Sequence, residues 1–165
     1  TILVNPINAA STSVDGIDIS GRYALRTQNL GVFTTRLNYS KTLDKHSRQF
    51  AGDPLNDDKA DLDNHDWRDK LNVSLAWNKG DWSNTLFLQR YGKVPNAASD
   101  AYLTPTVLVN ASVVYRLNER TTVSVAVNNL FNKVKQDASD GWPYYPIGNY
   151  SPVGRQGWLE AHYHF

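Results

Sequence analysis

The histidines and carboxylates are the side chains that could bind a metal ion or transfer protons. His162 and His164 lie two residues apart in an alternating stretch, so a strand would direct both imidazoles to one face. Glu160 is the one carboxylate near them on that face, and a metal centre needs more ligands. We interpret the pair as part of a hydrated wall. The sequence contains no Ser–His–Asp order and no phosphate-binding glycine loop, so we assign no catalytic residue, no metal ligand and no cofactor.

An acidic stretch, DPLNDDKADLDNHD, could offer oxygen ligands to calcium. Its candidate ligands are Asp57, Asp58, Asp61 and Asp63. The stretch lacks the central glycine of an EF-hand loop. We therefore expect a solvated acidic loop here.

The stretch DGWPYYPIGNYSP concentrates aromatic rings among prolines. Proline restricts the backbone, so the rings can be presented to a ligand at low entropic cost. Exposed rings stack on sugar faces or on aromatic ligands. We predict ligand binding by Trp142, Tyr144, Tyr145 and Tyr150. The alternative is that the rings pack on one another.

Composition limits the class of protein. The 165 residues are enough for one domain, and 17 Lys+Arg against 16 Asp+Glu give a net charge of +1, which argues against nucleic-acid binding. Cysteine is absent, which removes disulfides and thiolate metal sites. No apolar run approaches the ~20 residues of a membrane-spanning helix, which leaves a closed sheet as the other spanning structure. The sequence starts at Thr1 with no visible signal peptide, so we expect a start that is processed, trimmed or internal to a longer chain.

Alternation of apolar and polar residues with a period of two predicts strands with two unlike faces. It occurs in residues 17–25, 33–40, 71–77, 107–117, 123–127 and 159–165. Residues 84–92 also read as a strand, but either Leu86 and Leu88 or Phe87 and Tyr91 could share its apolar face. Thr1 to Asn5 resembles the end of a further strand. The expected total is about seven whole strands and one partial strand.

The predicted connections alternate between short and long. Short ones cover 26–31, 79–82 and 118–120, and long ones cover 6–15, 44–66, 95–105 and 133–152. Short turns on one rim and long loops on the other are typical of outer-membrane barrels. Aromatic residues near the predicted strand ends fit the interfacial girdles of such a barrel. A soluble β-sandwich is the alternative fold, because its strands alternate too.

The last residues form an alternating apolar row that ends in an aromatic side chain. The row consists of Leu159, Ala161, Tyr163 and Phe165. It resembles the terminal signal that the bacterial barrel-assembly machinery reads. In physical terms, the row predicts an amphipathic strand that can pair edge to edge with another strand.

Five partly overlapping stretches carry a family resemblance: VDGIDISGRYAL, WNKGDWSNTLFLQRYG, LVNASVVYRLNERTTVSVAVNNLF, VSVAVNNLFNK and the terminal GRQGWLEAHYHF. They resemble the last strands of TonB-dependent outer-membrane receptors. The resemblance implies an all-β, antiparallel, up-and-down transmembrane β-barrel of about 22 strands. Residues 1–165 would form about the last third of that barrel, roughly eight strands, and the plug domain would lie outside this chain.

The resemblance also implies a function. Such receptors take up an extracellular siderophore, glycan or vitamin through the Gram-negative outer membrane, and their long loops are extracellular. The implied partners are the rest of the receptor chain, TonB with its inner-membrane energising complex, the barrel-assembly machinery and membrane lipid. One alternative is a stand-alone eight-stranded barrel with a structural or adhesive role. An outer-membrane enzyme is a weaker alternative.

Overall fold

The computed structural model describes residues 11–50, 52–146 and 148–165. The chain forms seven long strands, which are β1 (Ser11–Thr27), β2 (Gly31–Arg48), β4 (Asp69–Lys79), β5 (Trp82–Tyr91), β8 (Thr106–Arg116), β9 (Thr121–Asn128) and β10 (Gln156–Tyr163). Three short strands are β3 (Asn56–Asp57), β6 (Val94–Pro95) and β7 (Tyr102–Leu103). Over these ranges the structure has no helix long and apolar enough to cross a membrane.

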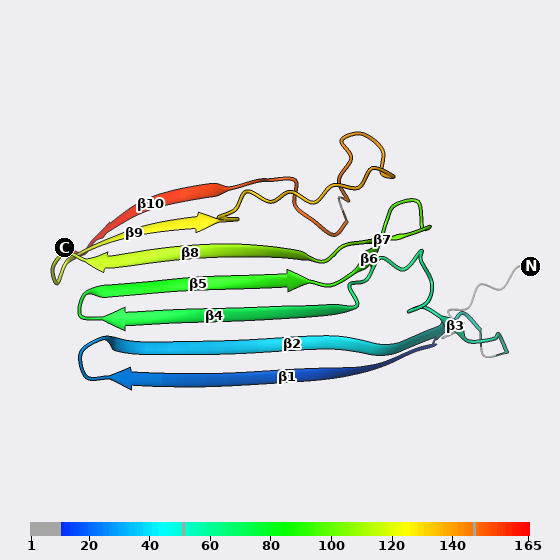
Figure 1. Ribbon diagram of the computed structural model, residues 1–165, viewed down its shortest axis with the longest axis horizontal. Coiled ribbons are helices and arrows are strands. Elements are labelled where there is room, and N and C mark those ends of the chain that lie inside the picture. Colours follow the sequence, from blue (N-terminus) through cyan, green and yellow to red (C-terminus); the bar gives the residue numbers. More distant parts are fainter. Residues whose placement is uncertain (1–10, 51, 147) are drawn as a thin grey trace, which may run out of the picture.

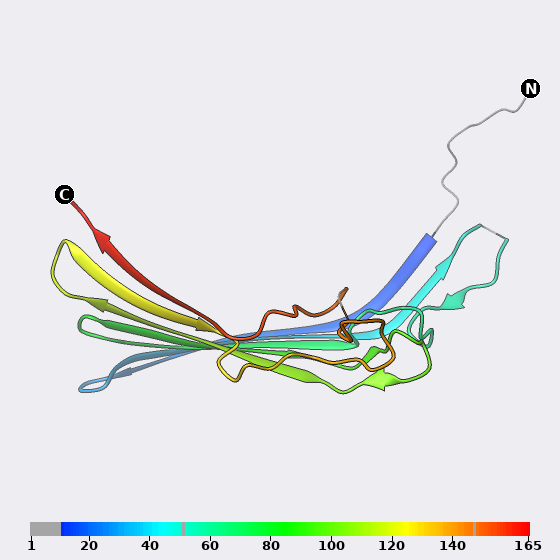
Figure 2. The ribbon, with the colours of Figure 1, turned by 90° about the horizontal axis from the view of Figure 1, so that it is seen from above.

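The long strands form one antiparallel sheet in the order β1-β2-β4-β5-β8-β9-β10, and β3 adds to β2. Figure 2 shows that the sheet is a single curved layer. In the described part of the chain, β1 and β10 pair on one side only, so the sheet is open. The antiparallel up-and-down arrangement confirms the predicted fold class. The predicted strand Thr1 to Asn5 lies outside the described residues.

The two rims of the sheet differ as the sequence predicts. Short turns join β1 to β2, β4 to β5 and β8 to β9, and all three lie at the same end of the sheet (Figure 1). The long connections lie at the opposite end, and the connection between β5 and β8 contains the small β6–β7 hairpin. Buried side chains, including Val94, Asp137 and Tyr150, gather toward this long-connection rim.

Strand register gives the sheet one apolar and one polar face. On the apolar face Leu75 of β4 lies opposite Thr35 of β2 and Leu86 of β5, and Val113 lies opposite Val125 farther along the sheet. Leu75 is 42% exposed and Val125 is 46% exposed. In a soluble β-sandwich, a second sheet would pack on this face and bury both side chains. Val109 on the same face is buried. Its backbone carbonyl oxygen accepts a hydrogen bond of 2.7 Å from the amide of Leu130, which follows β9.

Register also settles the face of β5. Leu88 pairs with Val73 and Val109, so Leu86 and Leu88 lie on the apolar face. Phe87 and Tyr91 lie on the polar face. Tyr91 is therefore not part of an apolar-face girdle, although its position near a strand end suggests one.

Aromatic pairs mark the short-turn rim of the apolar face. Ring centroids are 4.4 Å apart for Trp82 and Tyr115 and 6.4 Å apart for Phe33 and Trp77. The Trp77 indole donates a hydrogen bond of 2.6 Å to the Leu30 carbonyl in the adjacent turn. Membrane barrels carry aromatic girdles at such positions near the ends of their strands.

Strands β1 and β2 are longer than the alternation predicts. Residues 11–16 and 42–48 pair with each other in an extended arm, although the sequence predicts loops over 6–15 and from 44 onward. Polar residues dominate this arm, so it lacks the alternation of apolar and polar residues from which a strand would be predicted. The pairing also shifts between Asp15 and Gly16, where Leu43 is the extra residue of a β-bulge.

Candidate functional site

An aromatic cluster joins two loops at the long-connection rim. Trp67, which precedes β4, lies 4.8 Å from the Tyr91 ring and 5.8 Å from the Tyr150 ring between centroids. The Trp67 indole N–H donates to the Tyr150 hydroxyl at 3.1 Å. The Lys70 ammonium lies 4.3 Å from the centre of the Trp67 ring, within cation–π range. Trp67 therefore connects the last loop to the start of β4.

Hydrogen bonds hold the last loop against two others. The Asn149 side-chain amide donates to the His65 carbonyl at 2.7 Å. The Asp137 carboxylate accepts a bond of 2.8 Å from the Ala97 amide, and Ser139 Oγ accepts one of 3.2 Å from Ala98. Three segments distant in sequence thus form one rim.

Asp137 is the charged centre of this contact, and it is 3% exposed. Burial by itself raises the pKa of the Asp137 carboxyl, but bonds from the Ser139 hydroxyl and from the amides of Ala97 and Ser139 reverse the shift. The pKa of Asp137 is therefore held below its ordinary value. The carboxylate stays ionised at neutral pH despite its burial.

A hollow of about 970 Å³ lies beside the rim, on the side of the extended arm. Its wall combines the polar faces of β1, β2 and β4 with the segment before β4 and part of the last loop. Charged residues of both signs line it: Asp18, Lys41, Lys45, Asp63, Asp66, Arg68, Asp69 and Lys70. Lys45 pairs with Asp66 across it. Its volume is in the range that holds a small-molecule ligand.

The structure separates the four predicted ligand-binding aromatics. Trp142 is 85% exposed and Tyr144 is exposed, whereas Tyr145 is half-buried. Tyr150 is buried in the cluster with Trp67. Trp142 and Tyr144 are accessible to a ligand, and ligand binding by all four remains a prediction.

Sequence reasoning missed Trp67 and Asp137 as parts of this rim. Trp67 is 83 residues from Tyr150, and Asp137 is 40 residues from Ala97. Neither residue lies in a motif or a periodic stretch. A lone sequence carries no signal for contacts of this range.

The predicted assembly residues lie on and just beyond β10, which runs from the long-connection rim to the short-turn end of the sheet (Figure 1). Leu159, Ala161 and Tyr163 pair with Val125, Val123 and Thr121 and share the apolar face. Phe165 lies beyond β10, with its ring 5.0 Å from that of Tyr163. His162 Nε2 is 3.4 Å from Glu160 Oε2, whereas His164 also lies beyond β10.

A family model described as "TonB dependent receptor-like, beta-barrel" matches residues 3–130. The chain belongs to this family. A search of curated proteins finds no significant match. Membership confirms the predicted receptor-barrel resemblance and indicates a location in the Gram-negative outer membrane.

Two crystal structures of ferric enterobactin receptor variants from Pseudomonas aeruginosa are similar in fold. Both have a TM-score of 0.57, with 18% and 19% sequence identity. The match covers 90% of this chain and 21% of each receptor chain. This TonB-dependent receptor-like barrel chain thus spans about a fifth of the receptors it resembles.

Proposed function

We propose that the chain forms the C-terminal wall of a TonB-dependent receptor that takes up an extracellular ligand. The family match over residues 3–130 carries this proposal. The open sheet supports it, because β1 and β10 are two separate edges in the described residues and can be continued by other strands. The plug and the remaining strands would come from the rest of the receptor chain.

The faces and rims suggest an orientation. The apolar face with Leu75, Leu86 and Val125 would contact lipid, and the polar face with Arg22 and Arg36 would face the lumen. The short turns would face the periplasm and the long connections the exterior. Strand β10, whose outer edge has no partner among the described residues, would be the segment recognised by the barrel-assembly machinery.

The long-connection rim would bind the ligand. The hollow beside β1, β2 and β4 supplies ammonium, guanidinium and carboxylate groups, and Trp142 and Tyr144 supply exposed rings. We propose a siderophore, glycan or vitamin, of which the siderophore is favoured by the fold neighbours named as ferric enterobactin receptors. The residues of this chain would bind and orient the ligand, and TonB would drive its passage by displacing the plug.

Uptake by a deletion strain tests this function. The strain, complemented with the full-length gene, is supplied with labelled ferric siderophores, oligosaccharides and cobalamin, with and without tonB. We expect the complemented strain to take up one class, and only when TonB is present. Uptake that is unchanged by deletion of the gene or of tonB would refute the proposal.

Substitution of the exposed ring tests the ligand site. Trp142→Ala should weaken ligand binding by about 1 kcal/mol, the order of one aromatic contact. Trp82→Ala is the control, because Trp82 is also exposed but lies at the opposite rim. Equal ligand affinities of the two variants, measured at equal amounts of receptor in the membrane, would show that Trp142 does not contribute to ligand binding.

A further inference from the structure

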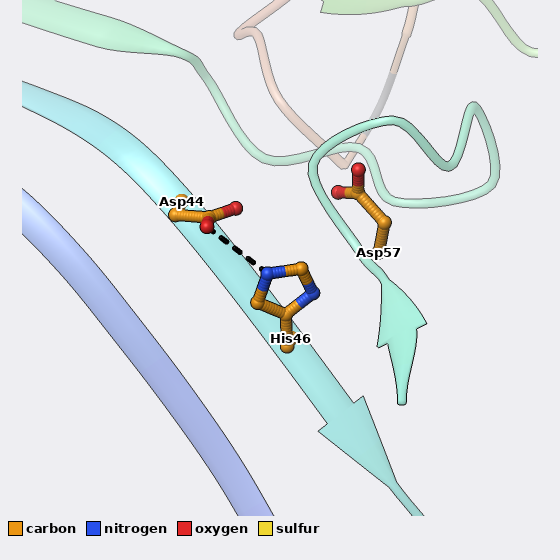
Figure 3. A group of neighbouring side chains, drawn as sticks. All are labelled: Asp44, His46 and Asp57. Atoms are coloured by element: carbon orange, nitrogen blue, oxygen red, sulfur yellow. Dashed lines mark hydrogen bonds and ion pairs between the residues drawn. The ribbon is translucent and has the colours of Figure 1, made fainter. Parts of the chain in front are cut away.

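Three side chains converge beyond the bulge in the extended arm of β2. Asp44 and His46 belong to β2, and Asp57 belongs to β3 (Figure 3). One ligand atom from each lies within 4.8 Å of the other two. His46 Nε2 is 3.0 Å from Asp44 Oδ2. The cluster is distinct from the hollow that we assign to the transported ligand.

Two strand pairings bring these residues to one face. His46 pairs directly with Asp57, and partners across an antiparallel ladder project to the same side. The bulge at Leu43 changes the phase of β2, so that Asp44 pairs with Asp15. An unbulged strand would place Asp44 and His46 on the opposite face, beside the hollow.

We propose that Asp44, His46 and Asp57 bind one divalent transition-metal ion of the zinc class. One imidazole and two carboxylates form a nitrogen and oxygen ligand set suited to such ions, with water in the remaining position. Ligand atoms of a tetrahedral zinc site are about 3.3 Å apart, for bonds of 2.0–2.1 Å. From a separation of at most 4.8 Å, the three side chains would have to move closer together to reach that spacing.

A second observation concerns the His46 ring. Its Nδ1 atom is excluded from solvent, and the Asn56 backbone contributes a hydrogen bond to the ring besides that of Asp44. Buried polar nitrogens are normally satisfied. A metal ion that replaces the proton between Nε2 and Asp44 is bound by both residues directly. With Asp57, this arrangement uses all three residues.

The charges around the cluster set the conditions of binding. Hydrogen bonds from the Ala60 and Lys59 amides lower the pKa of Asp57, so this carboxylate is ionised at neutral pH. The Lys59 ammonium donates to the Leu43 carbonyl and is the nearby competing cation. A proton on His46 competes as well, because its hydrogen bond to Asp44 raises the pKa of the imidazole.

Calorimetric titration of the full-length receptor with zinc, in detergent after chelator treatment, tests the site. We expect one zinc ion per chain. His46→Gln should weaken binding by more than the roughly 10–100-fold cost of losing an outer-shell partner, and Asp57→Asn should weaken it as well. His162→Gln is the matched control, since His162 also lies near one carboxylate, that of Glu160. It should bind zinc like the parent.

Cobalt replacement supplies a readout independent of affinity. A tetrahedral site with histidine and carboxylate ligands should give visible cobalt absorption in the parent and in His162→Gln, and the bands should disappear in His46→Gln. Absence of saturable zinc binding, or equal zinc binding by His46→Gln and the parent, would overturn the proposal. Calcium binding that His46→Gln does not change, in the absence of zinc binding, would also overturn the proposal. It would instead indicate a calcium site in the acidic stretch DPLNDDKADLDNHD.

Discussion

The carboxylate of Asp137 accepts a 2.8 Å hydrogen bond from the backbone amide of Ala97, and this contact joins the last loop to the connection between β5 and β8. The same carboxylate also accepts bonds from the Ser139 amide and hydroxyl. A barrel rim built of long loops has little packed core of its own. Polar contacts of this kind therefore determine whether its loops move together or separately.

Asp137→Ala should release the two loops from each other. Hydrogen bonds to a charged group contribute about 1.5–3 kcal/mol, so local opening should become roughly tenfold or more frequent. Amide hydrogen exchange at Ala97 and Ala98 measures it. Asp140→Ala is the control, because the Asp140 carboxylate bonds the adjacent Gly141 amide within the same loop. Unchanged exchange in Asp137→Ala would show that other contacts hold the rim.

The same carboxylate predicts a pH dependence of the rim. Its pKa is lower in the folded protein than the ordinary value of 3.8, so its stabilising contribution is present above that value. The contribution should be lost as the pH falls through the lower, folded pKa. Exchange at Ala97, compared between parent and Asp137→Ala at each pH, should differ at neutral pH and converge once the pH falls below the folded pKa of Asp137. A constant difference over that range would contradict the assignment.

Trp67→Ala should loosen the last loop. The substitution removes ring contacts with Tyr91 and Tyr150 and the bond to the Tyr150 hydroxyl. Each aromatic pair contributes about 0.5–1.5 kcal/mol, so we expect faster exchange around Asn149 and Tyr150 and faster proteolysis of the last loop. Trp142→Ala, at an exposed position of that loop, should leave both rates unchanged. Equal effects of the two substitutions would argue against the cluster as the anchor.

Neighbouring residues of β4 test the orientation of the sheet. Leu75 lies on the apolar face and Ser74 on the polar face. Leu75→Arg should cost about 2–4 kcal/mol if that face contacts the centre of the bilayer, whereas Ser74→Arg should be tolerated in a wet lumen. The yield of folded, heat-modifiable barrel in outer membranes measures the difference. The reverse order would place lipid on the other face.

The sequence alone determined the strands with a regular apolar period. Strands β4 and β8 begin and end within two residues of the alternating stretches 71–77 and 107–117. The apolar row Leu71, Val73, Leu75 and Trp77 also indicated which side of β4 is apolar. A period of two is a local property of the chain, and it persists in the folded sheet because every second side chain meets the same environment.

Only the tertiary structure decided the extended arm, the face of Tyr91 and the composition of the rim. The arm depends on pairing between two polar segments, and its bulge at Leu43 moves Asp44 and His46 to another face. Tyr91 joins Trp67 and Tyr150 because three chain segments meet at one end of the sheet. Such contacts depend on the register and spatial order of distant strands, and a local pattern in one sequence carries no information about either.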